Sequence, residues 1–196
     1  MLKIFTPNNL TLARLMLSVG FFWLIAKCQP GLSSAFIFDL AIGLFLLAGL
    51  TDVIDGYIAR KYSMETSLGR LLDPFVDKVL ICGAFIFFAG ANFVIDGRNV
   101  TDIAPWMIIL VIGRELLVTS LRGHSEAQGK AFPATIQGKI KMFLQSAAVI
   151  AVLVSIGHFY QQNWANIVRR IFIWTMIIFT LASMIGYLKK YFASSK

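Results

Sequence analysis

Residues 51–78 read TDVIDGYIARKYSMETSLGRLLDPFVDK and place four aspartates between long apolar segments. Read as a helix, the first part carries Asp52 and Asp55 on one face, three residues apart. Read as a second helix, the last part carries Asp73 and Asp77 on one face, four residues apart. Antiparallel helices joined by so short a turn bring both acidic faces together at a similar depth. The sequence therefore predicts a cluster of carboxylates inside an otherwise apolar protein.

The composition of the whole chain favours a nonpolar environment. Of its 196 residues, 58% are hydrophobic and 14% are charged, whereas a soluble domain usually carries about a quarter charged residues. This composition is typical of a polytopic membrane protein. It leaves little polar sequence for a separate soluble domain, so we expect a single membrane domain over residues 1–196. Cys28 and Cys82 lie far apart and indicate neither a disulfide framework nor a metal site.

Six segments approach or exceed the roughly 20 residues that a helix needs to cross the hydrocarbon of a bilayer. Short stretches rich in Gly, Pro, Asn or Gln separate several of them. The pattern predicts an all-α integral membrane protein with six transmembrane helices, over Leu10–Lys27, Ala35–Arg60, Leu68–Ile95, Ile103–Leu121, Ile136–His158 and Val168–Leu188.

The distribution of basic residues predicts the orientation. Cytoplasmic loops of membrane proteins carry an excess of Lys and Arg. With the N-terminus in the cytoplasm, the outer segments hold four of the 18 basic residues and the cytoplasmic half holds the other fourteen. We therefore expect both termini in the cytoplasm. The net charge of +8 then reflects cytoplasmic loops, anionic lipid and a phosphate-bearing substrate rather than nucleic acid. Arg169 and Arg170 are the discordant pair on the outer side.

Four clustered carboxylates have to be neutralised. An aspartate at the centre of a membrane helix costs about 2.5–3.5 kcal/mol on insertion scales, and neighbouring carboxylates also repel one another. Either some of them are protonated, or two divalent cations supply a formal charge of +4 against −4. Hard oxygen ligands suit Mg²⁺, Mn²⁺ or Ca²⁺, and paired metal ions suit phosphoryl chemistry. The residues predict a cage for two divalent ions that grips a diphosphate, with Arg60 adding positive charge. A structural polar network or an ion pathway is the alternative.

The spacing of residues 52–77 is Asp52-x2-Asp55-Gly56-x2-Ala59-Arg60-x8-Gly69-x3-Asp73-x3-Asp77. This pattern resembles the signature of the CDP-alcohol phosphatidyltransferase family at all eight of its fixed positions. The resemblance implies the CDP-alcohol phosphotransferase fold, with residues 52–77 as the catalytic signature. It also implies a homodimer in the cell (inner) membrane with an active site that faces the cytoplasm.

The same resemblance implies a role for each residue of the signature. The substrate is expected to be a CDP-linked lipid alcohol, usually CDP-diacylglycerol, with its diphosphate on two divalent ions, Mg²⁺ or Mn²⁺. The implied metal ligands are Asp52, Asp55, Asp73 and Asp77. Asp77 is also the implied general base, which takes a proton from the acceptor hydroxyl while CMP leaves. The implied pocket for the CDP-lipid consists of Asp52, Gly56, Ala59, Arg60 and Gly69.

Three further stretches resemble the phosphatidylglycerophosphate synthase branch of this family. They are Pro7-Asn8-x-Leu10-Thr11-x2-Arg14, the run from Gly113 to Arg122, and Gly138-Lys139-x-Lys141. This branch uses glycerol-3-phosphate as the acceptor. We expect Arg114, Arg122 and Lys139 to bind the acceptor phosphate, since arginine offers bidentate contacts to phosphate. Basic residues at cytoplasmic helix ends also occur without any ligand, which is the alternative for these three.

Two other functions fit parts of the pattern. A sibling enzyme would use another acceptor, either inositol phosphate or, as in a cardiolipin synthase, phosphatidylglycerol. A divalent-cation transporter would use the aspartates as its ion path. Arg60 disfavours the transporter, because an arginine beside such a path would repel the transported cation.

Overall fold

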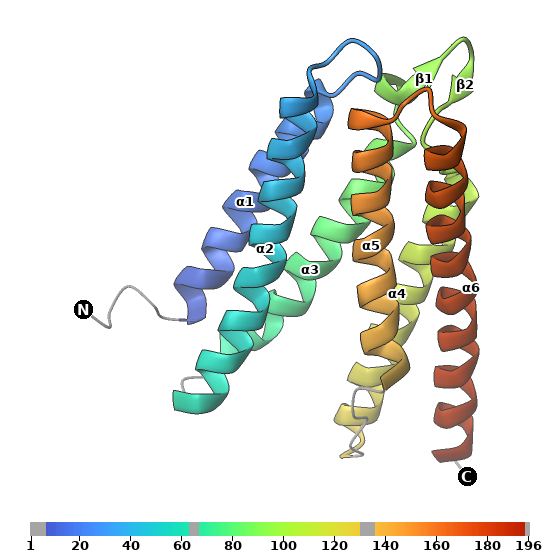
Figure 1. Ribbon diagram of the computed structural model, residues 1–196. Helices are drawn as coiled ribbons and strands as arrows, with labels where there is room; N and C mark the ends of the chain where they lie inside the picture. The colour runs from blue at the N-terminus through green and yellow to red at the C-terminus, as the bar shows by residue number, and fades with distance from the viewer. Residues whose placement is uncertain (1–6, 63–66, 130–135, 195–196) are drawn as a thin grey trace.

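The computed structural model describes the backbone of residues 7–62, 67–129 and 136–194, and the side chains of residues 12–51, 75–129 and 138–192. Within these ranges the chain forms long α-helices that run beside one another (Figure 1). The helices are α1 Pro7–Lys27, α2 Ala35–Tyr62, α3 Ser67–Phe88, α4 Pro105–Ala127, α5 Ile136–His158 and α6 Asn163–Ser194. The 3₁₀ helix η1 (Ala91–Phe93) and a hairpin of β1 (Val94–Ile95) and β2 (Arg98–Asn99) lie between α3 and α4.

The two ends of the helix bundle differ (Figure 1). One end, which we call the hairpin end, carries β1 and β2 with the connections from α1 to α2 and from α5 to α6. The other end, which we call the signature end, carries the last turns of α2 and α4, the first turns of α3 and α5, and the last turn of α6. The aspartate signature of residues 52–77 therefore lies toward the signature end.

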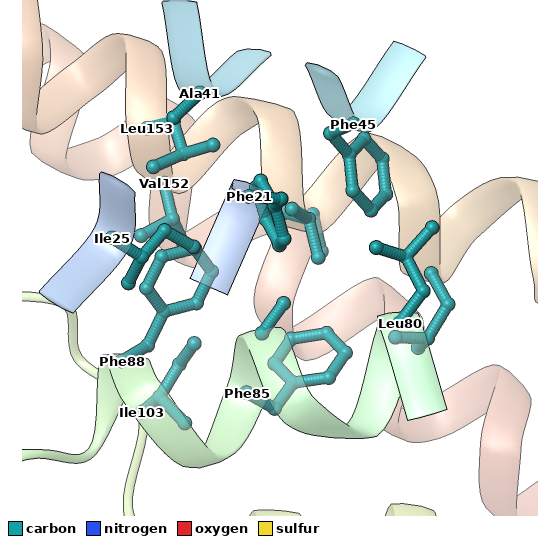
Figure 2. Packing of buried hydrophobic residues seen from close by; sticks show 14 of the residues in the cluster. Phe21, Ile25, Ala41, Phe45, Leu80, Phe85, Phe88, Ile103, Val152 and Leu153 are labelled. Carbon is teal, nitrogen blue, oxygen red and sulfur yellow. The ribbon is translucent and has the colours of Figure 1, made fainter. Parts of the chain in front are cut away.

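Aromatic and aliphatic side chains from all six of these helices form one core. Helix α1 packs against α2 and α3, and α5 packs against α2 and α6. Phe21 and Phe45 meet with their ring centroids 5.4 Å apart, and Phe88 packs edge-on against Phe93. Figure 2 shows the rings of Phe21, Phe45 and Phe88 among aliphatic side chains such as Ile25. Since lipid is as apolar as these side chains, close packing rather than exclusion of water holds such helices together.

Two of the described helices are long and apolar enough to cross a membrane, over Gly138–His158 and Asn163–Phe192. Helix α2 contributes a shorter apolar stretch, Ala35–Thr51. The predicted α-helical architecture is confirmed, and the predicted fifth segment, Ile136–His158, coincides with α5. The two long apolar helices support the prediction that this is a membrane protein.

The predicted third segment, Leu68–Ile95, is wrong at its end, because α3 stops at Phe88 and a small two-stranded sheet follows. Asp96 and Gly97 both have positive φ, 49° and 73°, as a two-residue type I′ hairpin turn requires. The side chains of Asn99 and Thr101 then donate to the carbonyl oxygen of Phe88 at 2.9 and 3.0 Å. These bonds satisfy a carbonyl that the end of a helix leaves without a partner.

The two arginines that the predicted orientation places on the outer side, Arg169 and Arg170, both pair with one carboxylate, Asp102. Arg169 is 4% exposed and donates from Nε to Asp102 Oδ2 at 3.2 Å, while Arg170 Nη2 lies 3.1 Å from Asp102 Oδ1. Arg169 Nη1 also donates to Ser155 at 3.1 Å. The buried guanidinium is therefore neutralised at the hairpin end and links α6 to α5 and to the segment before α4.

Helices α2 and α5 approach closely at Gly157. A Cβ atom at Gly157 would lie 2.6 Å from the Cβ atom of Phe38, which is closer than packed carbon atoms allow. Because Phe38 Cβ is attached directly to the backbone of α2, it cannot swing aside. Gly157 is thus required for the distance between α5 and α2.

We expect Gly157→Ala to destabilise the protein by about 1–3 kcal/mol, since overpacking forces the two helices apart. The measurement is the melting temperature of the purified protein in detergent. Gly43→Ala in α2 is the matched control, because a Cβ atom there meets nothing within 4 Å, and alanine favours the helix over glycine. Equal melting temperatures for Gly157→Ala and Gly43→Ala would contradict the close approach.

Candidate functional site

The backbone carries the aspartate signature on two packed helices. Residues 52–62 continue α2 and residues 67–77 begin α3, and these helices contact each other. The helical periodicity that the predicted pairing needs is therefore present. The side chains of seven predicted residues lie outside the described part of the structure: Asp52, Asp55, Gly56, Ala59, Arg60, Gly69 and Asp73. Their roles stay predictions.

Asp77 is the signature aspartate whose side chain the structure describes. Its side chain is 34% exposed, and its Oδ1 atom accepts a hydrogen bond from Arg14 Nη1 at 3.1 Å. Arg14 is 1% exposed and comes from α1. Helix α1 therefore brings a buried cation to the predicted general base.

Arg14 lies at the end of the motif of residues 7–14, and the sequence alone assigned it no role. It is the single charged residue between Lys3 and Lys27 in the sequence. A lone arginine in an apolar helix has to find an anionic or carbonyl partner, which is a signal that the sequence contains. The sequence does not indicate which residue that partner is. The structure shows that it is Asp77, which lies 63 positions further along the chain.

A second group of charges lies between α4 and α5. Glu115 Oε1 accepts from Arg114 Nη1 at 3.1 Å and from Lys141 Nζ at 2.5 Å. The three residues are 9%, 4% and 5% exposed, respectively. We call Arg114, Glu115 and Lys141 the α4–α5 charge cluster. Its formal charge, two cations and one carboxylate, is +1.

This cluster is tied to α6 and to α3. Arg114 Nε donates to Ser183 at 3.2 Å, and the guanidinium lies 5.3 Å from the centre of the Tyr187 ring, a cation–π distance. Thr119 donates to the backbone carbonyl of Glu115 at 2.8 Å and accepts a hydrogen bond from Lys78. Since Lys78 directly follows Asp77 in the sequence, the cluster lies beside the turn of α3 that carries Asp77.

The three residues predicted to bind an acceptor phosphate lie in different surroundings. Arg114 is buried in the α4–α5 charge cluster. Arg122 is half-buried two turns further along α4, and its Nε atom has no hydrogen-bond partner among the described residues. Lys139 is exposed near the start of α5. The buried lysine of this turn is Lys141, to which the sequence gave no role.

The residues of the signature fit divalent metal ions by their chemistry. Mg²⁺ and Mn²⁺ prefer carboxylate oxygens, and Asp77 is both a carboxylate and accessible from outside. Among the described side chains, no group of three His, Cys, Asp or Glu residues is close enough to hold a metal ion. Three of the four aspartates lie outside those side chains, so the predicted ligand set stands on the sequence and on the helical backbone.

An apolar groove of about 560 Å³ lies between α2, α5 and α6. Its lining extends from Phe143, in the first part of α5, to Trp164, in the first turn of α6. Leu46 of α2 and Phe172 of α6 also line it. Such a lining suits hydrocarbon rather than a polar ligand.

The chain matches known proteins over almost its whole length. The profile of the CDP-alcohol phosphatidyltransferase family matches residues 4–182. The CDP-diacylglycerol–glycerol-3-phosphate 3-phosphatidyltransferase of Bacillus subtilis (strain 168) is 34% identical over 193 residues, which is 94% of this chain and 93% of the relative. The enzymes of the same name from Rickettsia felis and Haemophilus influenzae are 34% and 32% identical, over 95% and 96% of this chain and 96% and 94% of their own lengths.

A double-mutant cycle tests whether Arg14 and Asp77 stabilise each other. We expect Arg14→Met and Asp77→Asn to show a coupling free energy of about 0.5–3 kcal/mol, because each single variant leaves the other charge without this partner. The measurement is chemical unfolding in mixed micelles without added metal. Arg14→Met combined with Asp39→Asn, at the hairpin end, is the control and should be additive. Additivity between Arg14 and Asp77 would contradict the ion pair.

Proposed function

This chain belongs to the CDP-alcohol phosphatidyltransferase family, and we propose that it transfers the phosphatidyl group of CDP-diacylglycerol to glycerol-3-phosphate. The observation that carries this proposal is the identity of 32–34% to enzymes of that name over more than nine-tenths of both chains. A hydroxyl oxygen of glycerol-3-phosphate attacks the phosphorus nearer the lipid. The bond from that phosphorus to the bridging oxygen breaks, and CMP leaves with the bridging oxygen. The products are phosphatidylglycerophosphate and CMP.

Asp77 is the general base in this proposal. It accepts the proton that the attacking hydroxyl loses, so that the new phosphorus–oxygen bond forms without a positive charge on the oxygen. The ion pair with Arg14 supports this role, because it fixes the direction of the carboxylate from the side of α1. The partial exposure of Asp77 supports access for the acceptor.

The other three aspartates complete the set of metal ligands. Asp52 and Asp55 on α2, with Asp73 and Asp77 on α3, would hold two divalent ions, Mg²⁺ or Mn²⁺. When bound, such ions neutralise the diphosphate and the charge that develops on it. Gly56, Ala59 and Gly69 have little or no side chain and leave room for the CDP moiety, together with Arg60 and Asp52. This assignment rests on the signature and on the helical backbone.

The acceptor phosphate is bound by basic residues of α4 and α5. Arg114, Arg122 and Lys139 are the residues that the sequence predicted for this task. The burial of Arg114 supports the assignment, since a desolvated arginine binds phosphate more strongly than an exposed one. The Nε atom of Arg122, which is buried and has no partner in the described part of the chain, supports it as well, because such a donor costs free energy until a ligand fills it.

The enzyme spans the cell (inner) membrane with six helices and has both termini and the active site on the cytoplasmic side. Two long apolar helices support the membrane location. The orientation rests on the excess of Lys and Arg in the cytoplasmic half. The bundle has its signature residues and the end of α6 toward one end, as an even number of crossings requires (Figure 1). A homodimer completes the proposal, by resemblance to the family.

An acceptor panel tests the function. Purified protein in detergent receives CDP-diacylglycerol, Mg²⁺ or Mn²⁺, and one acceptor: glycerol-3-phosphate, inositol phosphate or phosphatidylglycerol. We expect CMP release with glycerol-3-phosphate. Asp77→Asn, of nearly the same size, should lower the release by at least about 100-fold, since general-base catalysis contributes this much or more.

The other outcomes of the panel identify the rival functions. Release with inositol phosphate or phosphatidylglycerol, and not with glycerol-3-phosphate, would show a sibling enzyme with another acceptor. No release with any acceptor would overturn the transferase and favour a divalent-cation transporter.

A further inference from the structure

The α4–α5 charge cluster shares one carboxylate oxygen between two cations. Glu115 Oε1 is 3.1 Å from Arg114 Nη1 and 2.5 Å from Lys141 Nζ. Two like charges repel, and in a buried position the repulsion is screened only weakly. Glu115 is therefore what allows Arg114 and Lys141 to lie within reach of the same point.

The remaining contacts fix Arg114 from the side of α6. Its Nε atom donates to Ser183, and its guanidinium lies over the ring of Tyr187. These two contacts and the bond to Glu115 use Nε, Nη1 and one face of the guanidinium. The Nη2 atom is buried and has no hydrogen-bond partner among the described residues.

Lys141 has fewer contacts than Arg114 in the described part of the chain. Its ammonium group has three protons, and Glu115 is the hydrogen-bond partner of Lys141 in the part of the chain that the structure describes. One turn further along α5, Gln145 is 1% exposed, and its Nε2 atom is also without a partner there. The unfilled groups on Arg114, Lys141 and Gln145 are all donors, which is the arrangement that an oxyanion requires.

The charge and the position of the cluster agree with this requirement. The cluster keeps a formal charge of +1 after internal pairing. It is joined through Thr119 and Lys78 to the turn of α3 that carries Asp77. The cluster is therefore connected to the helix that carries the proposed general base.

We propose that Glu115 is a positioning residue for the acceptor: it holds Arg114 and Lys141 side by side so that both can bind the acceptor phosphate. This inference rests on the proposed function and assigns the phosphate contact of α5 to Lys141 in addition to the exposed Lys139. Glu115 touches neither substrate and acts through the two cations.

The test separates position from charge by comparing three variants. Glu115→Gln removes the charge, Glu115→Asp keeps the charge but draws the carboxylate back by one methylene, and Glu126→Gln changes an exposed glutamate of α4 as the control. We expect Glu115→Gln and Glu115→Asp each to raise the KM for glycerol-3-phosphate by about tenfold or more, since each loses the shared contact that positions the cations. The KM for CDP-diacylglycerol should change by less than about twofold, and Glu126→Gln should change neither constant.

Several results would overturn the inference while the proposed function stands. A Glu115→Asp variant with an unchanged KM for glycerol-3-phosphate would show that the charge of residue 115, and not the position of its carboxylate, determines binding of the acceptor. A lower KM in Glu115→Gln would show that Glu115 competes with the phosphate. Equal increases in the KM of both substrates, or a lower kcat with both KM values unchanged, would show a merely structural role. A wild-type protein that is inactive with glycerol-3-phosphate would overturn the proposed function as well as the inference.

A second measurement covers the case in which the Glu115 variants fold poorly. The double variant Glu115→Gln with Lys141→Met removes one charge of each sign, so the buried charge of the cluster remains +1. We expect it to fold and to lose at least about tenfold in inhibition by inorganic phosphate, measured against glycerol-3-phosphate. Wild-type inhibition by phosphate in this double variant would contradict the role of the Glu115–Lys141 pair.

Discussion

Ionised side chains that lie between apolar helices have to be paired, and the pairs determine how these helices are arranged. A charge in hydrocarbon or in a protein interior costs several kcal/mol unless an opposite charge and hydrogen bonds compensate for it. Among the described side chains, three buried arginines at helix contacts each meet this constraint through a carboxylate, which is distant in the sequence for Arg14 and Arg169 and adjacent for Arg114. The pairs are Arg14 with Asp77, Arg114 with Glu115, and Arg169 with Asp102.

The pairs divide between the two ends of the bundle and serve different purposes. At the hairpin end, Asp102 is shared by Arg169 and Arg170, and the group links α6 to the segment before α4. Among the described side chains, this group leaves no buried donor without a partner. Toward the signature end, the α4–α5 charge cluster keeps a net positive charge and unfilled donors. A structural link needs complete pairing, whereas a binding site for an anion needs an excess of donors. This contrast within one protein supports the proposal that the acceptor phosphate binds at α4 and α5.

The sequence predicted the helices well and the partners poorly, for a physical reason. Apolar length marks a spanning helix, so α5 was predicted with its observed bounds, whereas α3 was extended past Phe88 because the residues of η1 and β1 are as apolar as those of a helix. Spacing along a helix gave the aspartate signature, and the backbone of α2 and α3 agrees with it.

Lys141 was missed because its partner, Glu115, belongs to another helix, and periodicity within one segment carries no information about such pairs. The sequence does contain one indication that Lys141 is unusual. Lys141 and Gln145 are four residues apart, so two polar residues lie on one face of an apolar helix.

We propose that the aspartates of α2 and α3 bind two divalent ions together. Electron paramagnetic resonance of Mn²⁺ titrated into the purified protein tests it most directly, because free, single and paired Mn²⁺ ions give different spectra. The account predicts two bound Mn²⁺ ions per chain with the spectrum of a spin-coupled pair, and loss of the coupled signal in both Asp52→Asn and Asp73→Asn. Binding of one ion or none, or of two ions without coupling, would contradict the account.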